Sequence, residues 1–381
     1  MAEQTKQRYI YIDLLRGWAL LFMLESHVFD AFLATEYMSG PLFNTIRFLH
    51  GLIAPTFFFV SGYTFVVVGD RRWNDYLGFK GAYWHQLWRI IHILLIGYML
   101  RIPYFSFKRI LTGDPKILES FWHIDVLHLV AATLFFMLLM ANVLRSKSLH
   151  FVSISVSAII VMAFTPFVWS WNIHAHLPLG FADYFNASRG SQFPIFPWSA
   201  FLLSGGAAAH LMLRFRQREN LQKYFMGMFV AGVAGVVLTF AITFLPIQLY
   251  PPHDFFKTNP LFVLLRLSLV FMLMAIVWWW TERFRSGESF VSIIGSNSLI
   301  VYSGHLLIIY GMFHKGMSIW YLVGNTQPPW VIVLGAAVMI ALMSAIAYVW
   351  HRIKKKDKKL ARIIYIIVLL MFAYTFFTNE Y

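Results

Sequence analysis

The chain lacks cysteine and is poor in charge, above all in acidic residues. With no Cys among 381 residues, disulfides, thiol catalysis, thiolate metal sites and cysteine-linked lipids are excluded. Charged residues make up 13% of the chain and hydrophobic residues 59%, whereas soluble globular domains carry about 25% charged residues. Gly-rich phosphate loops and His-Glu-x-x-His motifs are also missing from the sequence. The composition therefore indicates a membrane protein.

Eleven apolar segments are long enough to span a bilayer, so we expect an all-α polytopic membrane protein with about 11 transmembrane helices in one bundle. They cover residues 12–34, 52–68, 87–103, 126–144, 151–170, 194–213, 224–245, 261–281, 290–313, 331–350 and 361–377. No connection between them is long enough for a second folded unit, which predicts one transmembrane domain over residues 1–381.

The loops between these segments carry Lys and Arg unevenly. Most of them fall on the side that also holds the N-terminus, which places the N-terminus in the cytoplasm and the C-terminus outside. The net charge of +14 comes mainly from this loop bias, and we expect no nucleic-acid partner.

The first apolar segment is unusual because it contains several ionisable residues. A helix turns about 100° per residue, so Arg16 and His27 share a face and lie about 16 Å apart along the axis. Asp13 and Asp30 fall close to that face, and Asp30 could orient the His27 ring. Ionisable residues on one face inside a membrane indicate a functional cavity. As an alternative, Asp13 and Arg16 can complement the helix dipole and reach lipid headgroups.

Polar residues also interrupt later segments. Arg89 lies three residues before His92, and His305 lies about 12 Å into its segment, counted from Asn297. Asn297 and Ser298 would begin a helix whose free backbone N–H groups suit an anion, although an ordinary helix cap explains them equally well. The pairs His174/His176 and His253/Asp254 have no third ligand at a recognisable spacing, so we expect no metal.

Four stretches occur in order along the chain and together resemble the transmembrane acyltransferase superfamily, most closely its bacterial heparan-alpha-glucosaminide N-acetyltransferase-like branch. They are Ile12 to Gly17 followed by His27, Ala54 to Tyr63, Phe196 to Trp198, and Gly295 to His305. The related O-acyltransferases tend to show Arg-x-x-Arg on the third helix, where this chain has Arg89-x-x-His92. In the heparan-type enzymes the catalytic His follows the first helix, so His50 competes with His27.

The resemblance implies transfer of an acetyl group from acetyl-CoA to a sugar hydroxyl or amine across a bacterial-type cytoplasmic membrane. The expected catalytic candidates are His27, Asp30, His50 and His305, with a His acting as base or as nucleophile. Candidates for binding the CoA donor are Asp13, Arg16, Arg89, Asn297, Ser298 and Arg283. Expected partners are the acyl-CoA donor, a sugar or glycan acceptor and the bilayer, with a homodimer left open. A rival hypothesis is a transporter or flippase that uses the same polar stripe as a solute or proton path.

Overall fold

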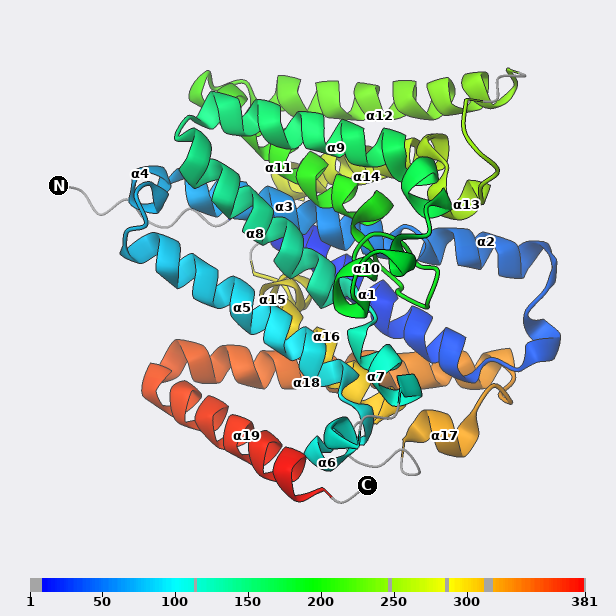
Figure 1. Ribbon diagram of the computed structural model, residues 1–381. Coiled ribbons are helices and arrows are strands. Elements are labelled where there is room, and N and C mark those ends of the chain that lie inside the picture. The colour runs from blue at the N-terminus through cyan, green and yellow to red at the C-terminus, as the bar shows by residue number, and fades with distance from the viewer. Residues whose placement is uncertain (1–8, 113–114, 246–248, 285–287, 312–317, 380–381) are drawn as a thin grey trace. The chain divides into compact units, whose positions relative to one another are not determined.

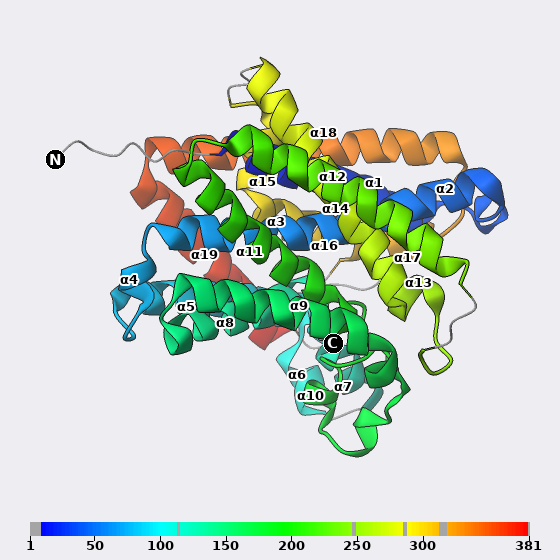
Figure 2. The same cartoon turned by 90° about the horizontal axis from the view of Figure 1, so that it is seen from above.

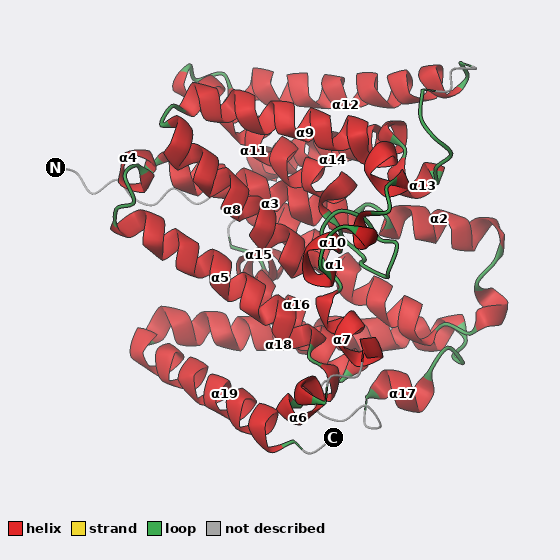
Figure 3. Ribbon diagram, viewed as in Figure 1, coloured by secondary structure: helices red, strands yellow, loops and turns green. Residues whose placement is uncertain are grey.

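The computed structural model describes residues 9–112, 115–245, 249–284, 288–311 and 318–379. Over these ranges helices joined by short loops make up most of the chain, and no strand is formed (Figure 3). A single bridge between Leu33 and Gln327 is the sole β-type pairing in the described part of the chain. The expected all-α class is confirmed.

Two compact units are present. Unit 1 comprises Met1–Ile53 and Leu273–Phe376, and unit 2 comprises Ala54–Met272 and Phe377–Tyr381. A single domain over residues 1–381 stays a prediction.

Unit 1 is built around its first helix. Its helices are α1 (Ile10–Phe32), η1 (Thr35–Tyr37), α2 (Gly40–His50), the second half of α14 (Pro260–Phe284), α15 (Phe290–Ser296), α16 (Ser298–Tyr310), α17 (Ile319–Val323), α18 (Pro329–Lys356) and most of α19 (Lys358–Thr378). Helix α1 packs against α15, α16 and α18 (Figure 1). Its side chains Leu15, Leu20 and Leu24 are buried, so a helix with four charged residues still forms the centre of this unit.

Unit 2 contains the longer succession of helices. They are most of α3 (Ile53–Asp70), α4 (Trp73–Tyr76), α5 (Gly81–Arg101), η2 (Pro103–Phe105), α6 (Phe107–Leu111), α7 (Pro115–Trp122), α8 (Val126–Leu144), α9 (Lys147–Ser170), η3 (Ile173–Ala175), α10 (Leu179–Ala182), α11 (Ile195–Gln217), α12 (Leu221–Thr243), α13 (Phe255–Thr258) and the first half of α14 (Pro260–Phe284). Helix α8 packs against α5, α9 and α11, and α9 against α11 (Figures 1 and 2).

Each of the eleven predicted segments forms a helix over most of its described residues, with ends that differ by a few positions and one interior break. By length and apolar character, eight helices in the described ranges could cross a membrane, or nine if one bent pair counts as a single span. Helices α1 and α5 are not among these eight, although they are similar to them in length. The ionisable residues predicted to share one face lie on α1. The number of spans and the sides of the two termini stay predictions.

The segment predicted as one span over 290–313 forms two helices, and the second begins at Ser298, directly after Asn297, as the sequence predicts. There α15 and α16 meet at a bend of 86°, and Asn297 has φ −114° and ψ 30°. Its buried amide donates to the Ile293 carbonyl at 2.8 Å, which favours ending the first helix over continuing it. The end predicted at Phe313 lies outside the described residues.

Close packing of α1 on α15 explains two glycines of the sequence stretches. A Cβ on Gly17 would lie 2.0 Å from the Val291 carbonyl oxygen, and one on Gly295 would lie 2.0 Å from the Asp13 carbonyl oxygen. Only glycine allows this approach, as is typical where helices cross inside a membrane. Unit 2 repeats the arrangement between α3 and α11, where Gly62 and Gly205 lie against the partner helix backbone.

Candidate functional site

The site in unit 1 forms where α1 meets α16. The rings of His27 and His305 have their centroids 5.0 Å apart and are tilted by 44°. The Tyr310 hydroxyl oxygen lies 3.4 Å from Nδ1 of His27. Two of the predicted catalytic residues are therefore neighbours, and a tyrosine that the sequence did not single out joins them.

His305 has a defined tautomer. Its Nδ1 lies 2.8 Å from the Val301 carbonyl oxygen, and a carbonyl can only accept, so Nδ1 carries the hydrogen. In the neutral ring Nε2 is then the basic nitrogen, and among the described residues it has no hydrogen-bond partner. The side chain is fully buried. Buried polar atoms are normally paired, so an unpaired one indicates a place for a ligand or water.

His27 is less enclosed than His305. It is partly exposed, whereas Leu20 and Met23 on the same face of α1 are 0% and 4% exposed. The imidazole thus lies at one end of a buried apolar stripe, in a position that a substrate could reach while His305 stays behind it.

The other predicted histidine of unit 1 is held elsewhere. Nε2 of His50 lies 2.8 Å from the Glu25 carboxylate, and its ring makes an edge contact with Phe29. Glu25 is on the side of α1 opposite to His27 because two residues correspond to a turn of about 200°. The structure therefore pairs His50 with Glu25 and does not bring it into the His27–His305 cluster.

Asp30 also has its own partner. Its carboxylate accepts a hydrogen bond of 2.7 Å from Arg47 of α2, and both side chains are exposed. We expected Asp30 to orient the His27 ring. In the structure the Tyr310 hydroxyl lies beside that ring, 3.4 Å from its Nδ1.

The predicted donor-binding residues divide between the two units. Asp13 and Arg16 are partly buried on α1, Ser298 opens α16, and Arg283 is exposed at the end of α14. Arg89 is exposed on α5 of unit 2.

Asn297 brings a further cation to the break between α15 and α16. Its side-chain oxygen accepts a hydrogen bond from the ammonium group of Lys354 on α18. Lys354 belongs to a basic run of the sequence over residues 352–362, and nothing in that run signals this contact. A pocket of about 370 Å³ in the same unit lies between α1, α15 and α18 and is lined by Ile10, Glu288, Ser292, His351 and Lys355.

Within the described part of the chain, no group of three or more His, Asp or Glu side chains is arranged to hold a metal ion.

The comparison with protein families bears on this arrangement. A family model described as an acyltransferase domain matches residues 9–348. The chain belongs to this membrane acyltransferase family. The match includes His27, His305 and Tyr310 and runs through both compact units. A search of curated proteins gives no match.

Two conclusions follow from membership in the family. The protein is a multi-pass membrane protein, and its activity is acyl transfer. An acyl transfer needs a group that takes a proton from the acceptor or attacks the acyl carbon itself, and the two neighbouring imidazoles are groups of this kind.

Proposed function

We propose that this acyltransferase moves an acetyl group from cytosolic acetyl-CoA to a hydroxyl or amine of a carbohydrate at the outer face of a bacterial-type cytoplasmic membrane. The resemblance to the heparan-alpha-glucosaminide N-acetyltransferase-like branch supports the donor and the acceptor. The observation that carries the chemistry is the His27–His305 pair with Tyr310 beside it.

His27 acts as the general base in this proposal. If its Nδ1–H donates to the Tyr310 oxygen, Nε2 is the basic nitrogen and takes the proton of the acceptor hydroxyl. The acceptor oxygen then attacks the thioester carbonyl carbon, the C–S bond breaks, and the CoA thiolate leaves. The imidazolium returns its proton to the thiolate, so that free CoA and the acetyl ester are the products.

In the rival route an imidazole attacks the thioester and carries the acetyl group to the acceptor. His305 fits either route through its basic Nε2. Rapid quenching after one turnover, followed by mass measurement of the intact protein, separates the two routes, because only the nucleophilic one adds an acetyl mass to the chain.

The donor is proposed to bind on unit 1. Its phosphates are anionic and its thioester must reach His27, so cations near the cytoplasmic end of α1 are required under the predicted topology. Arg16 and Lys354 supply positive charge there, and Asn297 and Ser298 begin α16, where the helix dipole also favours anions. Asp13 orients Arg16 in this scheme, and Arg283 and Arg89 are secondary candidates.

The test uses purified protein, labelled acetyl-CoA and a panel of carbohydrates. His27→Ala is expected to lose acetyl transfer by about 10²- to 10⁴-fold, while the matched variant His85→Ala, which alters an exposed histidine of α5, keeps it. Full activity in His27→Ala would remove His27 from the mechanism.

Donor binding is measured separately. CoA should raise the unfolding temperature of the protein, because a ligand that binds only the folded state stabilises it. Arg16→Gln should reduce this shift, and Lys359→Gln, on the exposed start of α19, should not. Movement of a solute without any use of CoA thioester would support the transporter hypothesis instead.

A further inference from the structure

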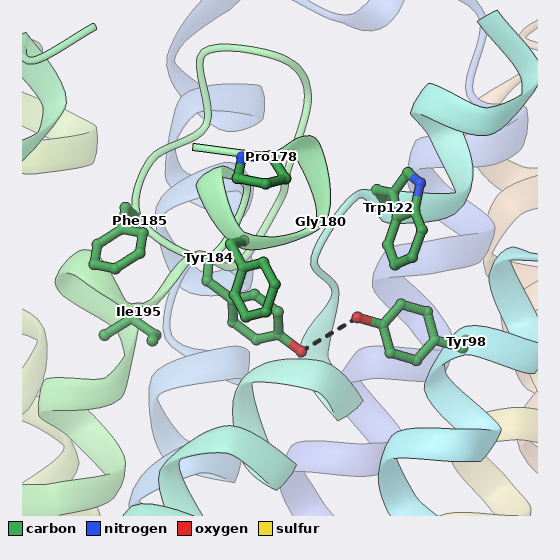
Figure 4. A pocket seen from close by; sticks show the side chains of 8 residues that line it. Tyr98, Trp122, Pro178, Gly180, Tyr184, Phe185 and Ile195 are labelled. Atoms are coloured by element: carbon green, nitrogen blue, oxygen red, sulfur yellow. Dashed lines mark hydrogen bonds between the residues drawn. The ribbon is translucent and has the colours of Figure 1, made fainter. Parts of the chain in front are cut away.

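Unit 2 contains a pocket of about 610 Å³ that no part of the proposed mechanism uses. It lies between the end of α5, the end of α7 and the segment that leads from α10 into α11 (Figure 4). Its lining residues are Tyr98, Trp122, Pro178, Gly180, Phe181, Tyr184, Phe185 and Ile195. The volume lies within the range of small-ligand pockets.

The lining is aromatic and uncharged. Rings come from Tyr98, Trp122, Phe181, Tyr184 and Phe185, and among the described residues that line the pocket none carries a charge. The hydroxyls of Tyr98 and Tyr184 face each other at 3.5 Å (Figure 4). Burial raises the pKa of Tyr184, and its contact with Tyr98 adds to this effect, so the hydroxyl stays protonated and able to donate.

Trp122 takes its place because residue 180 is glycine. A Cβ at Gly180 would lie 2.7 Å from the Trp122 ring, so any larger residue would displace the indole. Tyr98 and Trp122 meet edge to face with their centroids 6.1 Å apart. The two aromatic faces therefore stand at an angle and bound the pocket from two helices.

The segment that closes the pocket is fixed by internal hydrogen bonds. The buried Asn186 side chain donates to the Trp171 carbonyl at 3.3 Å and accepts from the Ser188 hydroxyl at 2.8 Å. The Ile195 amide donates to the Tyr184 carbonyl at 2.7 Å. Phe185 also packs on a small core formed by Val168, Ile173 and Ala182. The pocket thus exists before a ligand enters, which reduces the entropy cost of binding.

We propose that this pocket binds a neutral sugar ring. A pyranose has an apolar face of C–H groups that stacks on an aromatic ring and an edge of hydroxyls that need hydrogen-bond partners, and the pocket offers both. A phosphate or carboxylate would find no cation among the described lining residues. A quaternary ammonium would find no carboxylate, and an alkyl chain would leave the two phenol hydroxyls with only each other, at 3.5 Å, as hydrogen-bond partners.

This inference rests on the proposed function in one respect, because it makes the bound sugar part of the carbohydrate acceptor. Under the predicted topology the end of α5 and the segments after α7 and α9 lie on the outer side, where that acceptor is expected.

The experiment measures binding without catalysis. Full-length protein is placed in nanodiscs of phosphatidylethanolamine and phosphatidylglycerol, since alkyl maltoside detergents would themselves supply sugar rings. Saturation-transfer NMR then reports contact with methyl β-D-glucopyranoside and with methyl N-acetyl-β-D-glucosaminide. Tetramethylammonium and inorganic phosphate serve as probes of the excluded ligand classes.

Saturation transfer to the C–H protons of at least one glycoside is expected. Trp122→Leu should raise its Kd at least about tenfold, as should Gly180→Ala through displacement of the indole. The matched variant Trp171→Leu, which alters an exposed tryptophan of the same unit, should bind as the parent does. No glycoside signal, equal binding in all variants, or preferential binding of tetramethylammonium would overturn the proposal.

Acetyl transfer is followed in the same samples so that the two proposals fail separately. Transfer that persists unchanged in Trp122→Leu removes the pocket from acceptor recognition and leaves the proposed function intact. Glycoside binding with no acetyl transfer to any sugar leaves the pocket and removes the carbohydrate acetyltransferase.

Discussion

The two units each contain a pair of neighbouring histidines, and the pairs differ in how their ring nitrogens are hydrogen-bonded. In unit 2 the centroids of His150 and His210 lie 5.1 Å apart, nearly the same as the 5.0 Å of His27 and His305 in unit 1. Nε2 of His150 donates to the Met137 carbonyl at 3.0 Å, so Nδ1 is left to accept from Nε2–H of His210 at 2.9 Å. Both ring nitrogens of His150 therefore have hydrogen-bond partners, and we call such a pair closed.

The unit 1 pair is open by contrast. The distance between the two rings is nearly the same, yet Nε2 of His305 has no partner among the described residues. Burial of a histidine alone therefore does not separate the two pairs, whereas the hydrogen bonding of the second ring nitrogen does.

The largest expected effect separates the pairs by activity. His305→Ala should lower acetyl transfer by about 10²- to 10⁴-fold, because it removes an imidazole next to His27. His210→Ala should leave turnover per folded molecule unchanged. Labelled acetyl transfer, normalised to the folded fraction, measures both. Equal losses in the two variants would end the distinction between an open and a closed pair.

Stability should be affected in the reverse order, with the larger loss from a substitution in the unit 2 pair. His150→Ala removes a buried, doubly hydrogen-bonded side chain and leaves the Nε2–H of His210 and the Met137 carbonyl unpaired, so it should destabilise the fold by about 2–4 kcal/mol. His305→Ala should cost less, since its Nε2 forms no bond to lose. Chemical or thermal unfolding in nanodiscs gives the comparison, and a greater loss in His305→Ala would contradict it.

The open pair also depends on how closely α15, and with it α16, packs on α1. Gly295→Ala places a methyl group against the Asp13 backbone, where the clash should cost at least about 1–3 kcal/mol and reduce activity as the helices separate. Gly227→Ala is the matched control, because a Cβ there meets nothing within 4 Å, and it should stabilise the helix by up to about 1 kcal/mol. Unchanged stability in Gly295→Ala would show that the close crossing is not required.

Much of this fold follows from the sequence because the information is local. A run of about 20 apolar residues is sufficient to predict a spanning helix, and each predicted segment forms a helix over most of its described residues. His27 and His305 stand out for a similar reason, since ionisable residues are rare in such runs. The glycines of the sequence stretches mark helix crossings, which no single segment reveals by itself.

The remaining features depend on contacts between distant segments. Tyr310 is an ordinary aromatic residue in an apolar helix until α16 packs beside α1. From the sequence, Asp30 could pair with His27 on its own helix. Only the folded structure shows that its partner is Arg47 of α2. The hydrogen bond between Asn297 and Lys354 similarly joins residues that are 57 positions apart.

A third buried pair extends the comparison to a histidine and a carboxylate. In unit 2 the side chains of His174 and Asp183 are 6% and 0% exposed and lie 3.6 Å apart. Burial raises the pKa of Asp183 to about 6 and lowers the pKa of His174. The carboxylate therefore favours the folded state when protonated: its contribution is complete below the ordinary pKa of 3.8 and is lost as the pH rises through about 6.

Asp183→Asn should consequently stabilise the protein by about 1–2 kcal/mol at pH 7 and by nothing near pH 4. Burial of neutral His174 acts in the other direction, since it disfavours the folded state as the pH falls below 6.5, and it is common to both proteins. Unfolding temperatures of the parent and the variant between pH 4 and 8 provide the test. A difference that does not vary with pH would show that the Asp183 carboxylate does not titrate in this range.

The smallest effect concerns the tyrosine that completes the open pair. Tyr310→Phe removes the hydroxyl 3.4 Å from Nδ1 of His27 and keeps the ring that packs on α17 through Trp320. If the hydroxyl orients His27, kcat should fall by about tenfold or less, and the acidic limb of the pH profile should shift, because the protonated imidazole loses a neighbouring acceptor. A purely structural role would lower stability and leave the pH profile in place. Only the first outcome makes Tyr310 a positioning residue, and it would extend the contrast with the unit 2 pair, in which His150 is oriented by the Met137 carbonyl.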